Sequence, residues 1–246
     1  MSARLVLVVP CFNEASRLDA EAFVQLTTER RDAHVLFVDD GSADGTPAIL
    51  AGLAARSGGA ISVLTLPRNM GKTLAIHRGL LAALDQQPEI VGYWDADLAT
   101  PLSALGELVA VLDANAGVDI VMGARVKMLG RRISRSALRH YVGRVFATTA
   151  SVALGIGVYD TQCGAKLFRA NDVMRRTLAR PFATRWLVDV EILARYVRAI
   201  GPAAAERSIV EVPLHTWTDV PGSKMTVWRG VQAIWDLLGV ARQRTK

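Results

Sequence analysis

Short apolar runs alternate with segments of helical periodicity through the first half of this chain. The runs do not alternate apolar with polar residues, so both faces of each predicted strand are expected to be buried. Short buried strands with helices between them predict an α/β fold, in which a mostly parallel sheet carries helices on both faces. The predicted strands cover residues 5–9, 35–38, 61–64, 91–94 and 119–122, and the predicted helices cover residues 15–30, 46–55, 71–84 and 101–112.

Polar residues gather directly after each predicted strand. In open parallel sheets, ligands bind in a crevice beyond the carboxyl ends of the strands. We therefore expect these clusters to meet at one binding site. They occupy residues 10–14, 39–42, 68–72 and 95–97 and position 125.

The 246 residues, of which 51% are hydrophobic, suit one large globular domain or two closely fused halves. A formal net charge of +6 favours acidic partners such as phosphates, anionic lipid or nucleic acid. Cys11 and Cys163 are too few for a disulfide framework or a thiolate metal site, which is consistent with a reducing compartment. Because the chain shows neither a signal peptide nor about 18 consecutive apolar residues, we expect a cytoplasmic protein that does not cross a bilayer.

Two carboxylates lie two residues apart where the predicted strand 91–94 ends. Asp95 and Asp97 offer the hard oxygen ligands that Mg²⁺ or Mn²⁺ prefers, and such a cation usually keeps coordination positions for substrate phosphates. The triplet Asp95-Ala96-Asp97 therefore predicts a divalent cation site beside a diphosphate. By itself the triplet could equally occur by chance or form an Asx turn.

Two further clusters each allow a functional and a structural interpretation. Asp40 could accept the imide proton of a nucleotide base, whereas Ser42 or Asp44 in the same cluster could form a turn and cap the following helix. Lys72 could reach a phosphate from a helix N-terminus or remain a solvated lysine. A P-loop is excluded, because Leu66 stands where that motif requires its first glycine.

Several motifs resemble those of family 2 glycosyltransferases of the GT-A fold, which is a Rossmann-like α/β fold. They are residues 9–14 (VPCFNE), 38–42 (VDDGS), 68–72 (RNMGK) and 95–97 (DAD). A second set resembles dolichyl-phosphate glucosyltransferases and their bacterial polyprenyl-phosphate relatives. It comprises residues 123–125 (GAR), 160–168 (DTQCGAKLF), 185–191 (RWLVDVE) and 221–224 (PGSK).

The resemblance implies inverting transfer of a hexose from a nucleotide diphosphate sugar to a polyprenyl phosphate. It makes Asp97 the direct metal ligand, with Asp95 assisting through the ribose or a water. In related mannosyl enzymes a glutamine that approaches the metal follows the second aspartate by two positions, whereas Ala99 stands here, which argues against a third protein ligand and agrees with the glucosyl branch. The resemblance as a whole implies a uridine nucleotide. The residues implied to contact the nucleotide sugar are Pro10, Phe12, Asn13, Glu14, Asp39, Asp40, Lys72, Asp95 and Ala96.

The predicted acceptor is a phosphate monoester, whose second pKa near 6 leaves it largely dianionic at neutral pH. It needs no base to deprotonate it, but it needs positive charge to approach a second anion. Arg125, Arg131 and Lys166 are the candidates, with Arg132 or Arg135 as substitutes for Arg131.

Two aspartates complete the catalytic candidates, which are Asp97, Arg125, Asp160 and Asp189. In family members that act on sugar hydroxyls, a carboxylate near the position of Asp189 deprotonates the acceptor. Here Asp189 could bind sugar hydroxyls, or it could be an acidic residue at the N-terminus of a helix over residues 187–198. Asp160 could position a basic residue or the sugar.

Residues 125–144 contain basic and apolar residues and no acidic one, so they could form an amphipathic segment on an anionic membrane. The alternative is a solvated helix face that carries one or two phosphate ligands. Residues 145–159 predict a buried helix that ends at Gly155 or Gly157. Residues 225–246 predict an amphipathic C-terminal helix, and we expect the membrane anchor to be this helix or a separate small transmembrane protein.

Together these features predict a single GT-A domain over residues 1–246. Its parts would be a nucleotide-sugar half (1–124), an acceptor half (125–224) and the C-terminal helix (225–246). The predicted reaction uses UDP-glucose or another UDP-hexose on the cytoplasmic face of a membrane, in cell envelope glycan biosynthesis. The alternatives are a GDP-mannose-dependent polyprenyl-phosphate mannosyltransferase and a soluble glycosyltransferase with a small acceptor. We do not expect nucleic acid as a partner, because clustered aromatic residues are missing.

Overall fold

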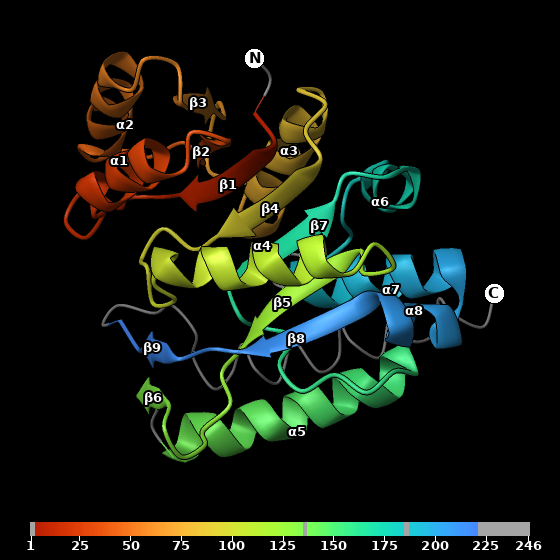
Figure 1. The fold of residues 1–246 in the computed structure, drawn as a ribbon. Helices are drawn as coiled ribbons and strands as arrows, with labels where there is room; N and C mark the ends of the chain where they lie inside the picture. Colours follow the sequence, from red (N-terminus) through yellow and green to blue (C-terminus); the bar gives the residue numbers. More distant parts are fainter. Residues whose placement is uncertain (1–2, 135–136, 185–186, 221–246) are drawn as a thin grey trace. The chain divides into compact units, whose positions relative to one another are not determined.

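The computed structural model describes residues 3–134, 137–184 and 187–220. The chain forms two compact units, each built from two separate segments (Figure 1). The first unit contains Met1–Leu98 and Gly164–Arg185, and the second contains Ala99–Cys163 and Trp186–Lys246. This division differs from the predicted boundary after residue 124, because a strand in the later segment pairs with the sheet of the first unit.

The first unit is built on parallel strands, as predicted. Strand β1 pairs in parallel with β2 on one side and with β4 on the other, and β2 pairs in parallel with β3. The sequence did not predict β7, which pairs with β4 in antiparallel orientation. The strands are β1 (Leu5–Cys11), β2 (Ala33–Asp39), β3 (Ile61–Thr65), β4 (Ile90–Trp94) and β7 (Ala165–Arg169).

Both faces of the central strands are buried, which confirms the interpretation of their apolar runs. The residues of β1 from Leu5 to Val9 are all at most 1% exposed. Helix α3 packs closely on β1 and β2, because a Cβ at Gly79 would lie 2.4 Å from a methyl group of Val8 and 2.7 Å from one of Val38. The helices of this unit are α1 (Ala20–Glu29), α2 (Thr46–Arg56), α3 (Lys72–Leu84) and α6 (Asp172–Leu178).

Helix α1 begins five residues later than predicted. The N–H groups of Arg17 and Leu18 donate to the Glu14 carbonyl at 3.0 and 2.8 Å and form a turn. Asp19 then caps the helix, since its Oδ1 accepts the N–H of Ala22 at 3.1 Å. Residues 15–19 therefore belong to the loop that follows β1.

The second unit contains two parallel strand pairs, β5 with β8 and β6 with β9. These strands are β5 (Ile120–Ala124), β6 (Arg132–Ser134), β8 (Ile209–Pro213) and β9 (Thr216–Thr218). The helices are a 3₁₀ turn (Leu102–Ala104), α4 (Leu105–Ala114), α5 (Ala137–Leu154), α7 (Val188–Ile200) and α8 (Pro202–Ser208).

Helix α5 corrects the prediction of a buried helix over residues 145–159. It begins before residue 145, and it ends at Leu154, where Gly155 adopts a φ of +68°. Its face is not buried throughout, since Val145 and Val152 are 60% and 77% exposed. The predicted end at Gly155 is confirmed, because a left-handed residue after a helix favours glycine.

Candidate functional site

The loops after β1 and β2 are joined to each other by hydrogen bonds. The N–H of Asn13 donates to Ser42 Oγ at 3.0 Å, and Asn13 Oδ1 accepts the N–H of Ala43 at 2.9 Å. The N–H of Glu14 donates to Thr46 Oγ1 at 2.8 Å. Asn13 has a φ of +54°, a left-handed conformation that asparagine tolerates better than most residues. The first two predicted clusters therefore lie side by side.

Asp40 connects this pair of loops to the third cluster. Its Oδ1 accepts the N–H of Met70 at 2.7 Å, and its Oδ2 accepts the N–H of Gly71 at 2.8 Å. Burial raises the pKa of Asp40 above its usual value, although these two N–H groups oppose the shift. Gly41 is required here, because a Cβ would lie 2.5 Å from the carbonyl carbon of Arg68. A carboxylate that already accepts two hydrogen bonds can still accept one more, from the imide N–H of a nucleotide base.

The neighbouring polar residues hold the loop. Asp39 is 1% exposed, and its Oδ1 accepts the N–H of Ser42 at 3.1 Å. The N-cap residue of α2 is Gly45, so the predicted cap by Ser42 or Asp44 is wrong, whereas the predicted turn is confirmed. Asp44 instead accepts the N–H of Thr46 at 2.9 Å through Oδ1. Ser42 binds Asn13, as described above.

Glu14 pairs with a cation that the motifs did not indicate. Its carboxylate is buried and accepts two hydrogen bonds from the Arg17 guanidinium, one of them from Nη2 at 2.6 Å. The hydrogen bond with Glu14 raises the pKa of Arg17, and the charges of Asp97 and Asp95 contribute further. Arg17 is therefore close enough to the predicted metal ligands to interact with them electrostatically. A buried glutamate requires a positively charged or hydrogen-bonding partner. The position of Glu14 in a strand-end motif was therefore the sequence signal that could have indicated Arg17.

Asp95 follows β4 and lies between a lysine and a glycine. Lys72 Nζ is 2.5 Å from Asp95 Oδ1, and Lys72 is the first residue of α3. The N–H of Asp95 donates to the carbonyl of Gly164 at 2.9 Å. A Cβ at position 164 would lie 2.0 Å from Asp95 Oδ2, so only glycine leaves room for this carboxylate. Leu98 then turns the chain with a φ of +50°, which is uncommon for leucine.

The donor set of Asp95 and Asp97 fits a divalent cation whose coordination is completed by a diphosphate. Among the described residues no group of three or more histidine, cysteine, aspartate or glutamate side chains forms a closed metal site. Asp95 Oδ1 is buried and makes no hydrogen bond with suitable angles to the described residues, so its contact with Lys72 is an ion pair only. A hard cation that keeps positions for phosphate needs one or two such carboxylates.

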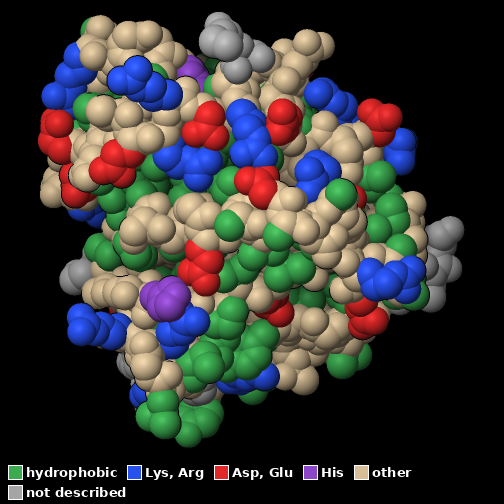
Figure 2. All heavy atoms as spheres, viewed as in Figure 1, with side chains coloured by type: hydrophobic (Ala, Val, Ile, Leu, Met, Phe, Trp, Pro, Cys, Tyr) green, Lys and Arg blue, Asp and Glu red, His purple; other side chains and the backbone are tan. Residues whose placement is uncertain are grey.

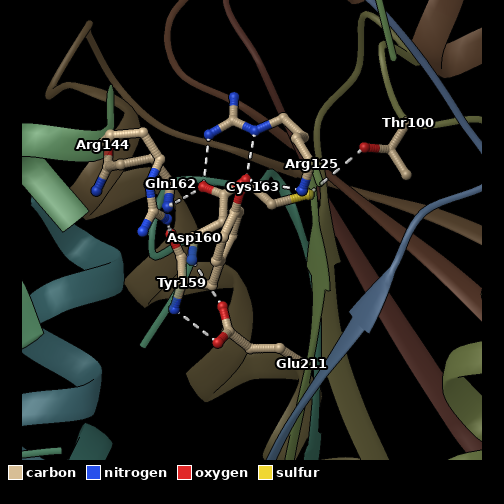
Figure 3. Close-up of polar contacts among 8 residues, drawn as sticks. All are labelled: Thr100, Arg125, Arg144, Tyr159, Asp160, Gln162, Cys163 and Glu211. Carbon is tan, nitrogen blue, oxygen red and sulfur yellow. Dashed lines mark hydrogen bonds and ion pairs between the residues drawn. The ribbon is translucent and has the colours of Figure 1, made fainter. Parts of the chain in front are cut away.

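In the second unit, Arg125 and Asp160 form a buried ion pair, which Figure 3 shows. Asp160 Oδ2 accepts from Arg125 Nε at 2.7 Å and from its backbone N–H at 3.0 Å, and Oδ1 accepts from Nη2 at 2.7 Å. Burial alone would lower the pKa of Arg125, but the charge and hydrogen bonds of Asp160 raise it overall. The guanidinium carbon also lies 5.3 Å from the ring centroid of Trp217. Arg125 is therefore a fixed, permanently charged group.

Two further side chains hold the backbone beside Asp160 (Figure 3). The Glu211 carboxylate accepts the N–H groups of Tyr159 and Asp160, both at 2.7 Å. Arg144 stacks on the Tyr159 ring at 3.9 Å from its centroid and donates to the Tyr159 carbonyl at 3.2 Å. Sequence reasoning did not single out Glu211, because no motif surrounds it.

The remaining candidates occupy different environments. Lys166 lies in β7 of the first unit, is 1% exposed, and places its Nζ 5.5 Å from the ring centroid of Tyr93. Asp189 lies in the first turn of α7 and is 8% exposed, which agrees with its interpretation as an acid at a helix N-terminus. Arg131 is half-buried, and its Nη1 makes no hydrogen bond to the described residues.

The structure thus divides the candidates between the units. The first unit contains Pro10, Phe12, Asn13, Glu14, Asp39, Asp40, Lys72, Asp95, Ala96, Asp97 and Lys166. The second contains Arg125, Arg131, Asp160 and Asp189. Pro10 and Phe12 are half-buried and Ala96 is buried. Arg135 and residues 185–186, 221–224 and 225–246 lie outside the described residues.

The segment 125–144 does not present all of its basic residues at the surface. Arg125 is bound to Asp160, and Arg144 stacks on Tyr159, whereas Lys127 and Arg132 are exposed. Figure 2 shows hydrophobic side chains at the foot of the view, around α5 and the loop before β6. The large apolar residues exposed there are Met128, Leu129, Tyr141, Val142, Val145 and Val152. Among the described residues, no helix has both the length and the apolar character that a bilayer span requires.

Comparison with known proteins agrees with this architecture. The chain is 31% identical to a dolichyl-phosphate beta-glucosyltransferase of Trichomonas vaginalis, over 98% of this chain and 73% of the relative. It is 28% identical to an undecaprenyl-phosphate 4-deoxy-4-formamido-L-arabinose transferase of Pseudomonas fluorescens, over 82% of this chain and 57% of the relative.

Among solved structures, the fold matches glucosyl-3-phosphoglycerate synthase of Mycobacterium tuberculosis in complex with Mn²⁺, uridine diphosphate and glucosyl-3-phosphoglycerate. The TM-score is 0.67 at 19% identity, over 98% of this chain and 80% of that one. A sequence model of the family described as Glycosyl transferase family 2 matches residues 6–176, which is well over half of the chain. The chain therefore belongs to glycosyl transferase family 2, and it is a glycosyltransferase of the GT-A fold.

Proposed function

We propose that this glycosyltransferase moves a hexose from UDP-glucose or another UDP-hexose to a polyprenyl phosphate, with inversion at the anomeric carbon. The observation that carries the proposal is the Asp95 carboxylate, whose buried oxygen lies at the end of β4 beside Lys72. Relatives named as dolichyl-phosphate and undecaprenyl-phosphate sugar transferases support the class of acceptor.

The residues of the first unit would bind the nucleotide sugar. Asp40 would accept the imide proton of uracil from its position between the loops after β1 and β3. Asp95 and Asp97 would hold Mg²⁺ or Mn²⁺, which when bound supplies charge neutralisation for the departing diphosphate. Lys72 forms an ion pair with Asp95, and Arg17 interacts electrostatically with both carboxylates, so these two cations would add positive charge near the diphosphate.

The acceptor phosphate would be drawn to Arg125 and Arg131 of the second unit, whereas Lys166, the third candidate, lies in the first unit and is 1% exposed. Arg125 uses Nε and Nη2 for Asp160, so its Nη1 edge would face the phosphate. An acceptor oxygen forms the new bond to the anomeric carbon from the face opposite the diphosphate, and UDP leaves with the electron pair of the broken bond. No general base is required, because the phosphate is already ionised. Asp189 would bind sugar hydroxyls.

We also propose that the enzyme acts at the cytoplasmic face of a membrane, in cell envelope glycan biosynthesis. Exposed Lys127 and Arg132 lie close in sequence to exposed apolar residues such as Leu129 and Tyr141, a combination that suits an anionic lipid surface. Residues 225–246 or a separate small transmembrane protein would complete the attachment. Flotation with anionic liposomes, with and without residues 225–246, tests direct binding, and an unchanged soluble fraction of both proteins contradicts it.

The reaction is tested by transfer of radiolabel from a panel of nucleotide sugars to short-chain polyprenyl phosphate with Mn²⁺ or Mg²⁺. We expect metal-dependent, butanol-extractable product that is lost in Asp97→Ala, because this change removes the direct metal ligand. Labelled lipid from GDP-mannose alone would correct the sugar and the nucleotide. Product formed only with a small soluble acceptor such as phosphoglycerate would overturn the lipid acceptor.

A further inference from the structure

We infer that Glu211 is a positioning residue for the acceptor phosphate. It fixes the backbone at Tyr159 and Asp160, and through Asp160 it sets the orientation of the Arg125 guanidinium. The inference rests on the proposed function, in which Arg125 binds that phosphate.

Glu211 lies on β8, and Arg125 directly follows β5, the strand with which β8 pairs in a fixed register. The pairing is parallel, with Glu211 opposite Met122. Groups held on paired strands keep their geometry better than groups on free loops. The loop that carries Asp160 has no strand of its own, so its position depends on side-chain contacts.

The Glu211 carboxylate supplies those contacts. One oxygen accepts the N–H of Tyr159 and the other accepts the N–H of Asp160, each at 2.7 Å. Arg144 holds the same segment from α5 by stacking on the Tyr159 ring and donating to its carbonyl. Two carboxylates and two guanidinium groups therefore meet around this short loop with balanced charge (Figure 3).

The orientation then passes to Arg125 through Asp160. The Asp160 carboxylate accepts hydrogen bonds from Nε, Nη2 and the backbone N–H of Arg125. It also accepts one from the N–H of Gln162 at 3.1 Å. These bonds fix the plane of the guanidinium and leave Nη1 on the opposite edge, without a hydrogen bond to the described residues (Figure 3). A shift of the loop would rotate that edge away from the phosphate.

Glutamine at position 211 would keep the size of the side chain but change its hydrogen bonding. An amide has one acceptor oxygen, and its NH₂ group would face a backbone N–H of Tyr159 or Asp160, so one of the two bonds is replaced by a repulsive contact. Glu206 offers a matched control, because it lines the same small cavity as Glu211 but is exposed.

The test compares Glu211→Gln with Glu206→Gln, Arg125→Ala and the double variant in transfer assays that vary polyprenyl phosphate. We expect Glu211→Gln to raise KM for polyprenyl phosphate about tenfold with a smaller change in kcat, since loss of a charged hydrogen bond is worth about that factor. Mn²⁺-dependent binding of UDP, measured by calorimetry, should not change, because its proposed ligands lie in the other unit. Glu206→Gln should behave as wild type.

The double variant separates positioning from a general loss of stability. If Glu211 acts through Arg125, Glu211→Gln should add no further increase in KM when Arg125 is already alanine. Glu211→Asp retains both acceptor oxygens, so it should show a smaller increase than Glu211→Gln, and it provides the measurement if Glu211→Gln does not fold.

The Glu211 and Arg125 variants separate the positioning role of Glu211 from the proposed role of Arg125 at the acceptor phosphate. An unchanged KM in Glu211→Gln, together with a raised KM in Arg125→Ala, overturns the role of Glu211 and leaves the proposed function intact. An equal effect of Glu211→Gln with and without Arg125 also overturns it. An unchanged KM in Arg125→Ala would instead remove Arg125 from the proposed acceptor site.

Discussion

Replacing Gly164 with alanine should weaken the candidate metal site without replacing a candidate ligand. Gly164 precedes β7, and its carbonyl accepts the N–H of Asp95 at 2.9 Å, so the two backbones are held together. Its φ does not lie in the left-handed region, which means that alanine can adopt the backbone conformation. The effect of the substitution is therefore steric.

The size of the effect follows from the contacts of the added carbon. An alanine Cβ would lie 2.0 Å from Asp95 Oδ2 and 2.2 Å from its Cγ, whereas ordinary contacts begin at 3.4 Å. Because the backbone bond holds the chain in place, the carboxylate must move by more than about 1 Å, and a displacement of this size at a reacting centre can reduce the rate about 100-fold. Such overpacking also costs about 1–3 kcal/mol of the free energy of unfolding.

The assay combines activity with unfolding of the free protein. We expect Gly164→Ala to require a higher Mn²⁺ concentration for half-maximal transfer and to lower the free energy of urea unfolding. Gly157→Ala is the matched control, because a Cβ there has no heavy atom within 4 Å. In an Asp95→Ala background the carboxylate is absent, so Gly164→Ala should then lower the free energy of unfolding by less than about 0.5 kcal/mol.

Two results would refute this reasoning. The first is a Gly164→Ala enzyme with the metal requirement and the unfolding free energy of the Gly157→Ala control. The second is an equal cost of Gly164→Ala with and without the Asp95 carboxylate, which would assign the cost to another neighbour.

Two further predictions concern buried polar groups of the second unit. Asp160→Asn should lower the free energy of urea unfolding by about 3–5 kcal/mol at neutral pH, because it leaves the Arg125 charge buried without its ion pair; a loss below about 1 kcal/mol would contradict it. Burial and the charge of Asp119 raise the pKa of Tyr196 in the folded protein, while the unfolded tyrosine ionises near pH 10, so stability should decline as the pH rises above about 10. In urea unfolding between pH 8 and about 11, the free energy of unfolding of Tyr196→Phe should lack the part of the decline that Tyr196 causes. A decline as steep as that of the wild type would refute this prediction.

The strands of the first unit could be predicted because their signal is local. A run of apolar residues identifies a doubly buried strand whatever it pairs with, and the residues at its carboxyl end then identify a binding edge. Strand β7 gave no such signal, since Lys166 and Arg169 interrupt its apolar pattern. In the structure Lys166 lies opposite Tyr93 of β4 and is buried.

The pairings within the candidate site could not be predicted in the same way. The resemblance indicated Arg125 and Asp160, and the structure joins them, in agreement with the interpretation that Asp160 positions a basic residue. The contacts of Glu211 with residues 159–160, and of Gly164 with Asp95, join positions about 50 or more residues apart in sequence. Such contacts depend on tertiary packing and leave no local pattern.

Arg125 and Lys72 each have a carboxylate partner, but the two pairs differ in how easily a substrate could separate them. The side chains of Arg125 and Asp160 are 12% and 9% exposed, so breaking this pair would leave a buried charge. Those of Lys72 and Asp95 are 45% and 29% exposed, and exposed ion pairs contribute little stability. Of these two pairs, exchange of partners is therefore easier at Asp95, where a metal could replace Lys72 and leave the lysine for a phosphate. This difference explains why the proposed nucleotide site depends on a metal, whereas the proposed acceptor site relies on an arginine that keeps its carboxylate.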